Sequence, residues 1–226
     1  VQTCALPISS KLRDHLGMDV TIASETFQHT GSFKFRAAYN VAINVSNDEL
    51  IGVSSGNFGQ ALAYAAKLTG KKCTVIMPHT SAQVKVEAVR SYGAEADLIN
   101  VNEVSRTERL AQLAAERPDA YLASAFDDEY VIEGNSTLGD ELAEKKFDAV
   151  IVPIGGGGLS SGIIRSFCRN GVTTKVFAAE PQMANDASRS LAAGRIVAND
   201  FEPQTIADGA RDRKSTRLNS SHTDIS

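Results

Sequence analysis

The chain has little of what marks several protein classes. It contains no tryptophan and only three cysteines among 226 residues, Cys4, Cys73 and Cys168. Their odd number and wide spacing argue against a disulfide framework and a zinc site, and indicate a reducing compartment. No run approaches the roughly 18 apolar residues of a membrane-spanning helix, and no secretory signal opens the chain. We therefore expect a soluble, cytoplasmic protein without a membrane partner.

Neither sign of charge is in large excess. The 23 basic and 27 acidic residues give a net charge of −4, which argues against nucleic acid as the main partner. The chain is 42% hydrophobic and 22% charged, a composition that buries a real core. Its length suits one large domain or two small ones.

The two ends differ in character from the middle. Residues 213–226 are polar without helical or strand periodicity, and residues 1–8 lead poorly into the basic stretch that follows. We interpret both ends as non-native sequence and leave them out of the fold. Ordinary frayed termini are the alternative.

Short strands and helices alternate along the middle of the chain. The strand-like runs are rich in Val and Ile and bounded by Gly, Pro or Asn, as in buried parallel sheets. Helical periods lie between them. The alternation predicts an α/β protein with parallel sheets, whose ligands bind at the carboxyl ends of the strands. The expected strands are Leu50–Val53, Cys73–Met77, Ala96–Val101, Ala149–Val152 and Lys175–Ala179, and the expected helices are Gln60–Leu68, Ser81–Tyr92, Glu103–Glu116, Tyr130–Lys146 and Ser160–Cys168.

A lysine stands in an unusual place in the segment Thr30–Arg36, TGSFKFR. Lys34 falls in the first turn of a helix expected to start near Phe33, where the helix dipole disfavours a cation. Phe33 and Phe35 flank it. These surroundings predict a lowered pKa and a neutral, nucleophilic amine; a solvated surface lysine is the alternative.

Two further loops join a strand to a helix. Ser54–Gln60 reads SSGNFGQ and Pro153–Leu159 reads PIGGGGL. Small residues let backbone amides point at an anion, and the helix dipole adds to the attraction. Four consecutive glycines cost about 0.5–1 kcal/mol each relative to alanine, which a closely approaching phosphate would explain. A simple N-cap and a tight turn are the alternatives. Neither loop is a dinucleotide fingerprint or a Walker loop.

Together, SFKFR, SSGNFGQ and GGGGL resemble the pyridoxal-phosphate enzymes of fold type II, in the branch of serine/threonine dehydratases and serine racemases. The resemblance covers about Ser9 to Arg211. It implies two parallel-sheet, three-layer domains of the tryptophan synthase β-like kind. Residues 9–48 and 127–212 would form the large cofactor domain and residues 49–126 the small one. The family's catalytic region extends beyond Ala210, so the large domain looks incomplete, without the partner of the pyridine nitrogen.

The resemblance also implies a role for each matching residue. Lys34 would be the Schiff-base lysine, Phe33 would pack beside the pyridine ring, and Asn57 would hydrogen-bond the phenolic oxygen. Ser55 would lie on the ring face opposite the lysine. The phosphate would be held by Gly155, Gly156, Gly157, Gly158 and Leu159, and the substrate carboxylate by Ser54, Ser55, Gly56, Asn57 and Phe58. Phe58 and Ala37 stand where many relatives have histidine and glycine.

A fourth segment, Glu180–Asp186, resembles the divalent-cation site of the serine racemase branch. Glu180, the carbonyl of Ala184 and Asp186 would be the ligands. Such a hard oxygen set suits Mg²⁺ or Ca²⁺. A solvated acidic loop is the alternative.

The implied activity is β-elimination from a hydroxy amino acid of the L-serine or L-threonine type, giving a 2-oxo acid and ammonia, with Lys34 as the base. Ser55 on the other face would also allow racemisation, and 3-hydroxyaspartate is a further substrate to consider. The resemblance implies a small amino-acid substrate and a homodimer for the full-length protein. Two other classes stay open: a nucleotide-binding α/β module that uses GGGGL, and a fragment without activity.

Overall fold

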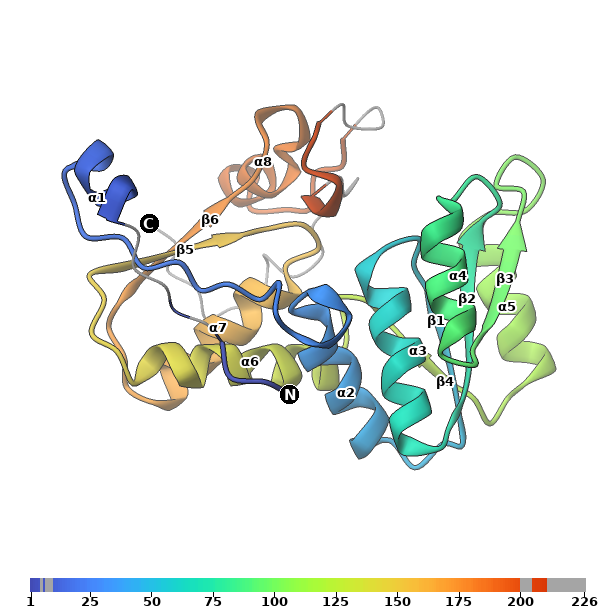
Figure 1. Cartoon of the computed structure of the whole chain (residues 1–226). Helices are drawn as coiled ribbons and strands as arrows, with labels where there is room; N and C mark the ends of the chain where they lie inside the picture. The colour runs from blue at the N-terminus through green and yellow to red at the C-terminus, as the bar shows by residue number, and fades with distance from the viewer. Residues whose placement is uncertain (5, 7–9, 200–204, 211–226) are drawn as a thin grey trace.

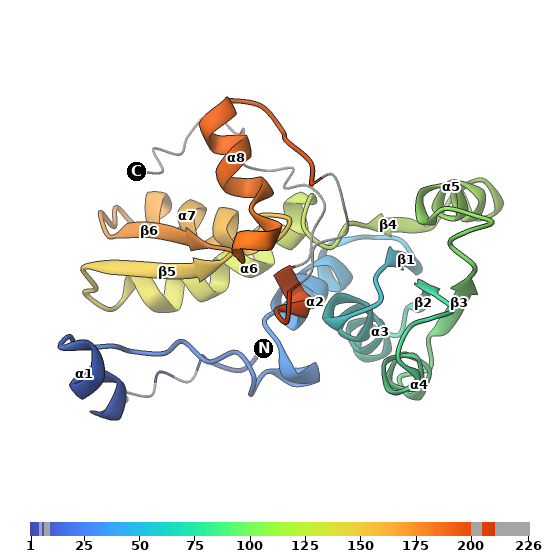
Figure 2. The same ribbon diagram turned by 90° about the horizontal axis from the view of Figure 1, so that it is seen from above.

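The computed structural model describes residues 1–4, 6, 10–199 and 205–210. The chain forms two α/β units that lie beside each other (Figure 1). One unit contains a four-stranded sheet and the other a two-stranded sheet. Helix α2, Lys34–Asn44, lies between them in both views (Figures 1 and 2) and packs against helices of each unit.

The four-stranded sheet is parallel, with the order β3-β2-β1-β4. Strand β1 pairs with β2 from Leu50 opposite Cys73 and with β4 from Leu50 opposite Tyr121. Side chains alternate between two cores, because Leu50 packs with helices α3 and α4 whereas Ile51 packs with α5. The elements of this unit are β1 Glu49–Val53, α3 Asn57–Thr69, β2 Lys72–Pro78, α4 Gln83–Ser91, β3 Glu95–Ile99, α5 Arg106–Glu116 and β4 Tyr121–Ala123.

The second unit is built on the parallel pair β5, Ala149–Pro153, and β6, Lys175–Ala179. Helices α6, Glu129–Ala143, and α7, Gly158–Arg169, cover one face of this pair (Figure 2). Val152 packs with both helices there. On the opposite face Ile151 is 73% exposed. The remaining elements are α1 Ser10–Leu16, η1 His29–Gly31, η2 Gln182–Ala184, α8 Asp186–Ala193 and η3 Asp208–Ala210.

The first residues of the chain take part in the fold, although sequence reasoning left them out. Cys4 is buried against Leu138 and Leu142 of α6, and its amide donates to a carboxylate oxygen of Glu141 at 2.6 Å. Gln2 exchanges hydrogen bonds with the side chain of Gln28. That residues 1–8 are non-native stays a prediction. Residues 213–226, for which the same was expected, lie outside the described residues.

The expected α/β alternation is confirmed, with each predicted strand within two residues of its observed bounds. Helix α5 starts later than predicted, at Arg106, because Ser105 and Glu108 form a capping box there. Strand β4 and helix α8 were not predicted; β4 has only three residues, too few to show a period. Among the described residues, no helix is long and apolar enough to cross a membrane.

Candidate active site

Lys34 starts helix α2 and points its amine to the junction of the two units. Its Nζ donates a hydrogen bond of 2.8 Å to the carbonyl oxygen of Ala125. The same atom lies 5.1 Å from the ring centre of Phe33 and 5.8 Å from that of Phe58. Both distances suit cation–π attraction. The half-buried amine is thus held between two aromatic rings and one carbonyl.

One of the two expected flanking rings is a different residue. Phe35 is 1% exposed and packs in the core of the four-stranded unit, edge-on to His29 and stacked with Tyr39. Successive helix residues diverge by about 100°, so Lys34 and Phe35 point in different directions. Phe58, from the SSGNFGQ loop, takes the place that sequence reasoning gave to Phe35.

The SSGNFGQ loop joins β1 to α3. Helix α3 starts at Asn57 without a side-chain hydrogen bond at its N-cap, Gly56. The amide of Gly56 donates instead to the Ser54 hydroxyl at 3.2 Å. Asn57 is exposed, Ser54 and Ser55 are half-buried, and Phe58 is buried. The loop therefore brings a helix N-terminus and two accessible hydroxyl-bearing residues to the side of the unit where Lys34 lies.

The glycine loop joins β5 to α7, and the protein itself explains several of its glycines. Gly157 has a φ of 88° and caps α7 without a side chain, a conformation that favours glycine. A Cβ at Gly156 would lie 2.3 Å from the Phe126 ring, and one at Gly158 would lie 2.9 Å from the Phe126 backbone. Leu159 packs into the core of this unit. Close packing as well as a bound phosphate can thus account for the loop.

The segment Ser124–Asp128 connects the lysine to the glycine loop, and sequence reasoning missed it. Ala125 accepts the Lys34 hydrogen bond, and Phe126 packs on Gly156 and Gly158. Asp128 caps α6 by accepting from the amides of Tyr130 and Val131. A signal was present, because an aspartate before an apolar helical period is a typical N-cap.

Asp128 is also tied to the sheet of the other unit. Its second carboxylate oxygen accepts a hydrogen bond of 2.9 Å from the Tyr121 hydroxyl of β4. Burial, together with this hydrogen bond, raises the pKa of Tyr121. Tyr121 therefore stays a protonated donor across the physiological range, and the segment has a fixed anchor at each end.

Polar atoms near Lys34 have room for a polar ligand. The hydroxyls of Thr30 and Ser32 are buried and have no hydrogen-bond partner within the part of the chain that the structure describes. Buried polar atoms normally have one. Helix α7 starts with amides that no side chain caps, a setting that attracts phosphate. The residues present therefore fit a phosphate-bearing group that reaches the Lys34 amine.

The predicted cation ligands follow β6, and other groups already bond to two of them. The Glu180 carboxylate accepts from the amides of Ala187 at 3.1 Å and Ser188 at 2.8 Å, at the start of α8. Asp186 accepts from the Asn199 amide at 2.9 Å. Burial raises the pKa of Glu180, and the two amides offset only part of that shift. A cation held by Glu180, Ala184 and Asp186 stays a prediction, and the described residues contain no cluster of three His, Cys, Asp or Glu suited to a metal.

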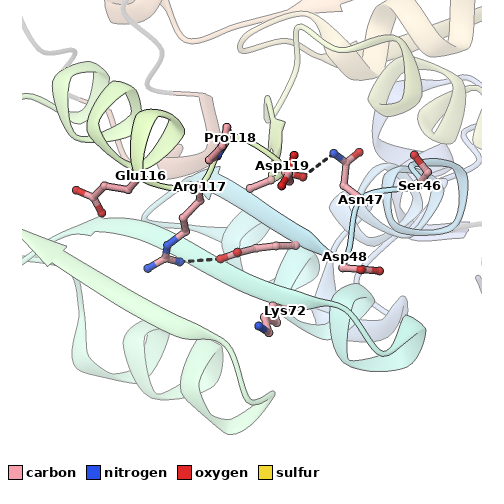
Figure 3. A pocket seen from close by; sticks show the side chains of 10 residues that line it. Ser46, Asn47, Asp48, Lys72, Glu116, Arg117, Pro118 and Asp119 are labelled. Carbon is pink, nitrogen blue, oxygen red and sulfur yellow. Dashed lines mark hydrogen bonds and ion pairs between the residues drawn. The ribbon is translucent and has the colours of Figure 1, made fainter.

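A groove of about 610 Å³ lies elsewhere, near the amino ends of β1 and β2 (Figure 3). Arg117 crosses it to pair with Glu49 at 2.6 Å, and Asn47 donates to the carbonyl of Asp119 at 2.8 Å. None of the predicted site residues lines this groove. Ion pairs between neighbouring elements account for its polar lining.

Comparison with known proteins points to the same family as the motifs. The family model described as "Pyridoxal-phosphate dependent enzyme" matches residues 6–225. The chain is 39% identical over 207 residues to the beta-hydroxyaspartate dehydratase of Paracoccus denitrificans, covering 89% of this chain and 65% of that protein. It is 39% identical to the L-threo-3-hydroxyaspartate ammonia-lyase of Saccharomyces cerevisiae, covering 90% and 64%, and 35% identical to the serine racemase of Homo sapiens, covering 90% and 62%.

Solved structures show the same fold. A bacterial threonine deaminase, from the source abbreviated T.th., superposes with a TM-score of 0.89 at 38% identity, over 96% of this chain and 71% of that one. The serine racemase of Dictyostelium discoideum gives a TM-score of 0.85 at 35% identity, over the same two shares. The fold expected from the three motifs is confirmed. The chain spans slightly less than two thirds of the length of these curated relatives.

Proposed function

Since the chain belongs to the pyridoxal-phosphate dependent enzymes, we propose that the protein carries this cofactor on Lys34 and eliminates ammonia from a β-hydroxy amino acid. One observation carries the proposal. The Lys34 amine is held between Phe33 and Phe58 and bonds to Ala125, and the neighbouring residue Phe126 packs on the glycine loop. Lysine and loop therefore share one support.

We assign the cofactor contacts to residues that surround this amine. The amides of Gly155–Leu159 at the start of α7 would hold the phosphate, Phe33 would pack on the ring, and Asn57 would bond to the ring oxygen. When bound, pyridoxal phosphate draws electrons away from the α-carbon of an amino acid and so makes its proton removable. The protein supplies binding, orientation and proton transfer.

Two groups of the chain would handle the substrate. The first-turn amides of α3, with Ser54 and Ser55, would bind the carboxylate and so fix which bond of the α-carbon faces Lys34. The Lys34 amine would then accept the α-proton at Nζ and return it to the leaving hydroxyl. Phe33 and Phe58 would keep water away from that amine.

A second activity is supported by a specific observation. Ser55 is half-buried in the loop opposite the lysine, and serine racemases are among the relatives of this chain. A hydroxyl on the other face of the substrate could return the α-proton there and invert the configuration. The first two relatives act on hydroxyaspartate by name, so 3-hydroxyaspartate belongs among the substrates to test beside L-serine and L-threonine.

The test is release of ammonia and 2-oxo acid from these three amino acids, with added pyridoxal phosphate. The variant is Lys34→Ala, and the matched control is Lys72→Ala, which removes an exposed lysine at the edge of the remote groove. We expect activity in the unaltered and control proteins and a loss of at least about a thousandfold in Lys34→Ala, the scale of a removed base. Equal turnover by Lys34→Ala would overturn the proposal.

A chain that releases no ammonia but racemises serine would favour the second activity. In that case Ser55→Ala separates the two faces. It should abolish inversion while proton removal at Lys34, followed as exchange of the α-hydrogen with deuterated water, continues.

A further inference from the structure

Arg36 stands two residues after Lys34 on α2 and is buried, with 1% of its surface exposed. All five N–H groups of its guanidinium donate hydrogen bonds. Two form a fork on Glu25, with Nε at 2.6 Å and Nη2 at 3.0 Å from its two oxygens. The other three reach α6 and the first residues of the chain: Glu141 at 2.8 Å, Thr137 at 3.0 Å and the carbonyl of Gln2 at 3.3 Å.

The backbones of α2 and α6 touch beside this arginine. A Cβ at Gly134 of α6 would lie 2.5 Å from the carbonyl oxygen of Arg36 and 2.8 Å from the Cα of Ala37. Only glycine permits such an approach without a shift. The arginine therefore lies where the two helices cannot come closer, and its hydrogen bonds decide how α2 is rotated about that point.

The same helix α6 follows the residue that receives the lysine. Ala125, the acceptor for Lys34, stands four residues before Glu129, where α6 starts. The segment between them is pinned by the Asp128 cap. Lys34 and Arg36 thus attach one turn of α2 to the beginning and the middle of one helix.

The charges around Arg36 make this attachment selective for arginine. The side chain of Glu25 is 9% exposed and that of Glu141 is 26% exposed. Burial alone would lower the pKa of Arg36, but the hydrogen bonds to both carboxylates raise it above its usual value. A lysine would keep the charge and lose the planar fork that serves two carboxylates and a hydroxyl together.

We propose that Arg36 is a positioning residue for Lys34, which holds the first turn of α2 so that the lysine amine reaches both Ala125 and the cofactor. It touches neither the cofactor nor the substrate. The inference rests on the proposed function, because it assigns a cause to the placement of the lysine that the cofactor would join.

The experiment compares Arg36→Lys with Arg169→Lys. Arg169 is the matched control, because it also bridges to α6, bonding Glu133 at 2.6 Å and Asp140 at 2.8 Å, but it stands on α7 away from α2. The dissociation constant of pyridoxal phosphate and the visible absorption of the bound cofactor are measured for each protein. The melting temperature of the cofactor-free protein is measured in parallel.

A second readout needs no cofactor. Reductive methylation with formaldehyde and borohydride, followed by peptide mass mapping, gives the labelling rate of Lys34 relative to the exposed, remote Lys72. This ratio reports the placement of the Lys34 amine in the cofactor-free protein. If the unaltered chain binds no pyridoxal phosphate, the proposed function fails, and the ratio still decides the role of Arg36.

We expect Arg36→Lys to weaken cofactor binding about tenfold, equal to about 1.4 kcal/mol, to shift the visible absorption, and to change the Lys34/Lys72 ratio. Arg169→Lys should change none of these. Unchanged binding, absorption and ratio in Arg36→Lys would overturn the inference, even with a lower melting temperature. Equal changes in both variants would overturn it too.

Glu141→Gln keeps the experiment decisive if Arg36→Lys does not fold. The amide retains the shape and a hydrogen-bond acceptor but removes one of the two charges facing Arg36. A shift of the same kind in the Lys34/Lys72 ratio, with cofactor binding weakened about two- to threefold as one charge-assisted bond becomes neutral, supports the inference. A ratio equal to that of the unaltered protein overturns it.

Discussion

The two sheets of the protein differ in how they are covered. The middle residues of β1 and nearly all of β2 are buried, because helices pack on both faces of the four-stranded sheet. In β5 and β6 only Val152 is fully buried, and Ile151 is 73% exposed. Parallel sheets are normally covered on both faces. The four-stranded unit therefore contains its own cover, whereas the two-stranded unit has it on one side.

The relatives give this difference a context. The chain spans 65% of the beta-hydroxyaspartate dehydratase that it matches, so about a third of that protein lies outside the part compared. The site lies between the two kinds of unit, because Lys34 contacts Phe58 of the covered unit and Ala125 just before α6. Its accuracy depends on both.

The cysteines should show the largest contrast between the units. Burial raises the pKa of Cys73 in β2 to about 12 and that of Cys4 to about 12, whereas Cys168 in α7 is exposed. A thiol of ordinary pKa near 8.5 holds about a thousandfold more thiolate at neutral pH. A thiol reagent followed by peptide mapping should label Cys168 at least that much faster. Equal rates in the folded protein would contradict the difference in cover.

Two isoleucines test the packing directly. Ile51 in β1 is fully buried and Ile151 in β5 is 73% exposed. Ile51→Ala should lower the free energy of unfolding by about 2–5 kcal/mol, because it leaves a cavity in the core. Ile151→Ala should change it by less than about 0.5 kcal/mol. Denaturant unfolding measures both, and a large loss at Ile151 would mean that something in solution covers β5.

A smaller effect concerns acid stability of the two-stranded unit. The hydrogen bond from Arg169 lowers the pKa of Glu133 below its usual value of 4.5. A carboxylate with a lowered folded-state pKa adds stability above its unfolded pKa, and that stability is lost as the pH falls through the folded-state pKa. Both side chains are nearly half exposed, so the contribution is at most about 0.5 kcal/mol.

The test of this effect is thermal unfolding from pH 6 downward in the unaltered protein and in Arg169→Gln. The variant should be slightly less stable at pH 6, and the two curves should converge at acid pH. Parallel curves would show that the ion pair contributes nothing to the pH dependence.

Sequence reasoning located the strands well, because each buried strand is a short apolar run between turn residues. It failed where the determining contact was not local. Phe35 was expected beside the lysine, yet its direction on the helix takes it into the core. Strand β4 was missed because three residues, held by pairing with β1, carry no period.

The site was predictable in its motifs and not in its supports. Lys34 and the two loops stand out by composition, but the contact of Phe126 with the glycine loop joins segments about 30 residues apart in the chain. Arg36 bonds to Glu141, which is 105 residues away. No local pattern announces such a pair, and only the fold brings it together.

The central claim is that Lys34 is the residue that the cofactor joins. The most direct measurement loads the protein with pyridoxal phosphate, reduces it with borohydride, and locates the added group by peptide mass mapping. We predict one modified peptide, containing Lys34, and no such peptide after Lys34→Ala. A group attached mainly to another lysine, or spread over exposed lysines alone, would contradict the account.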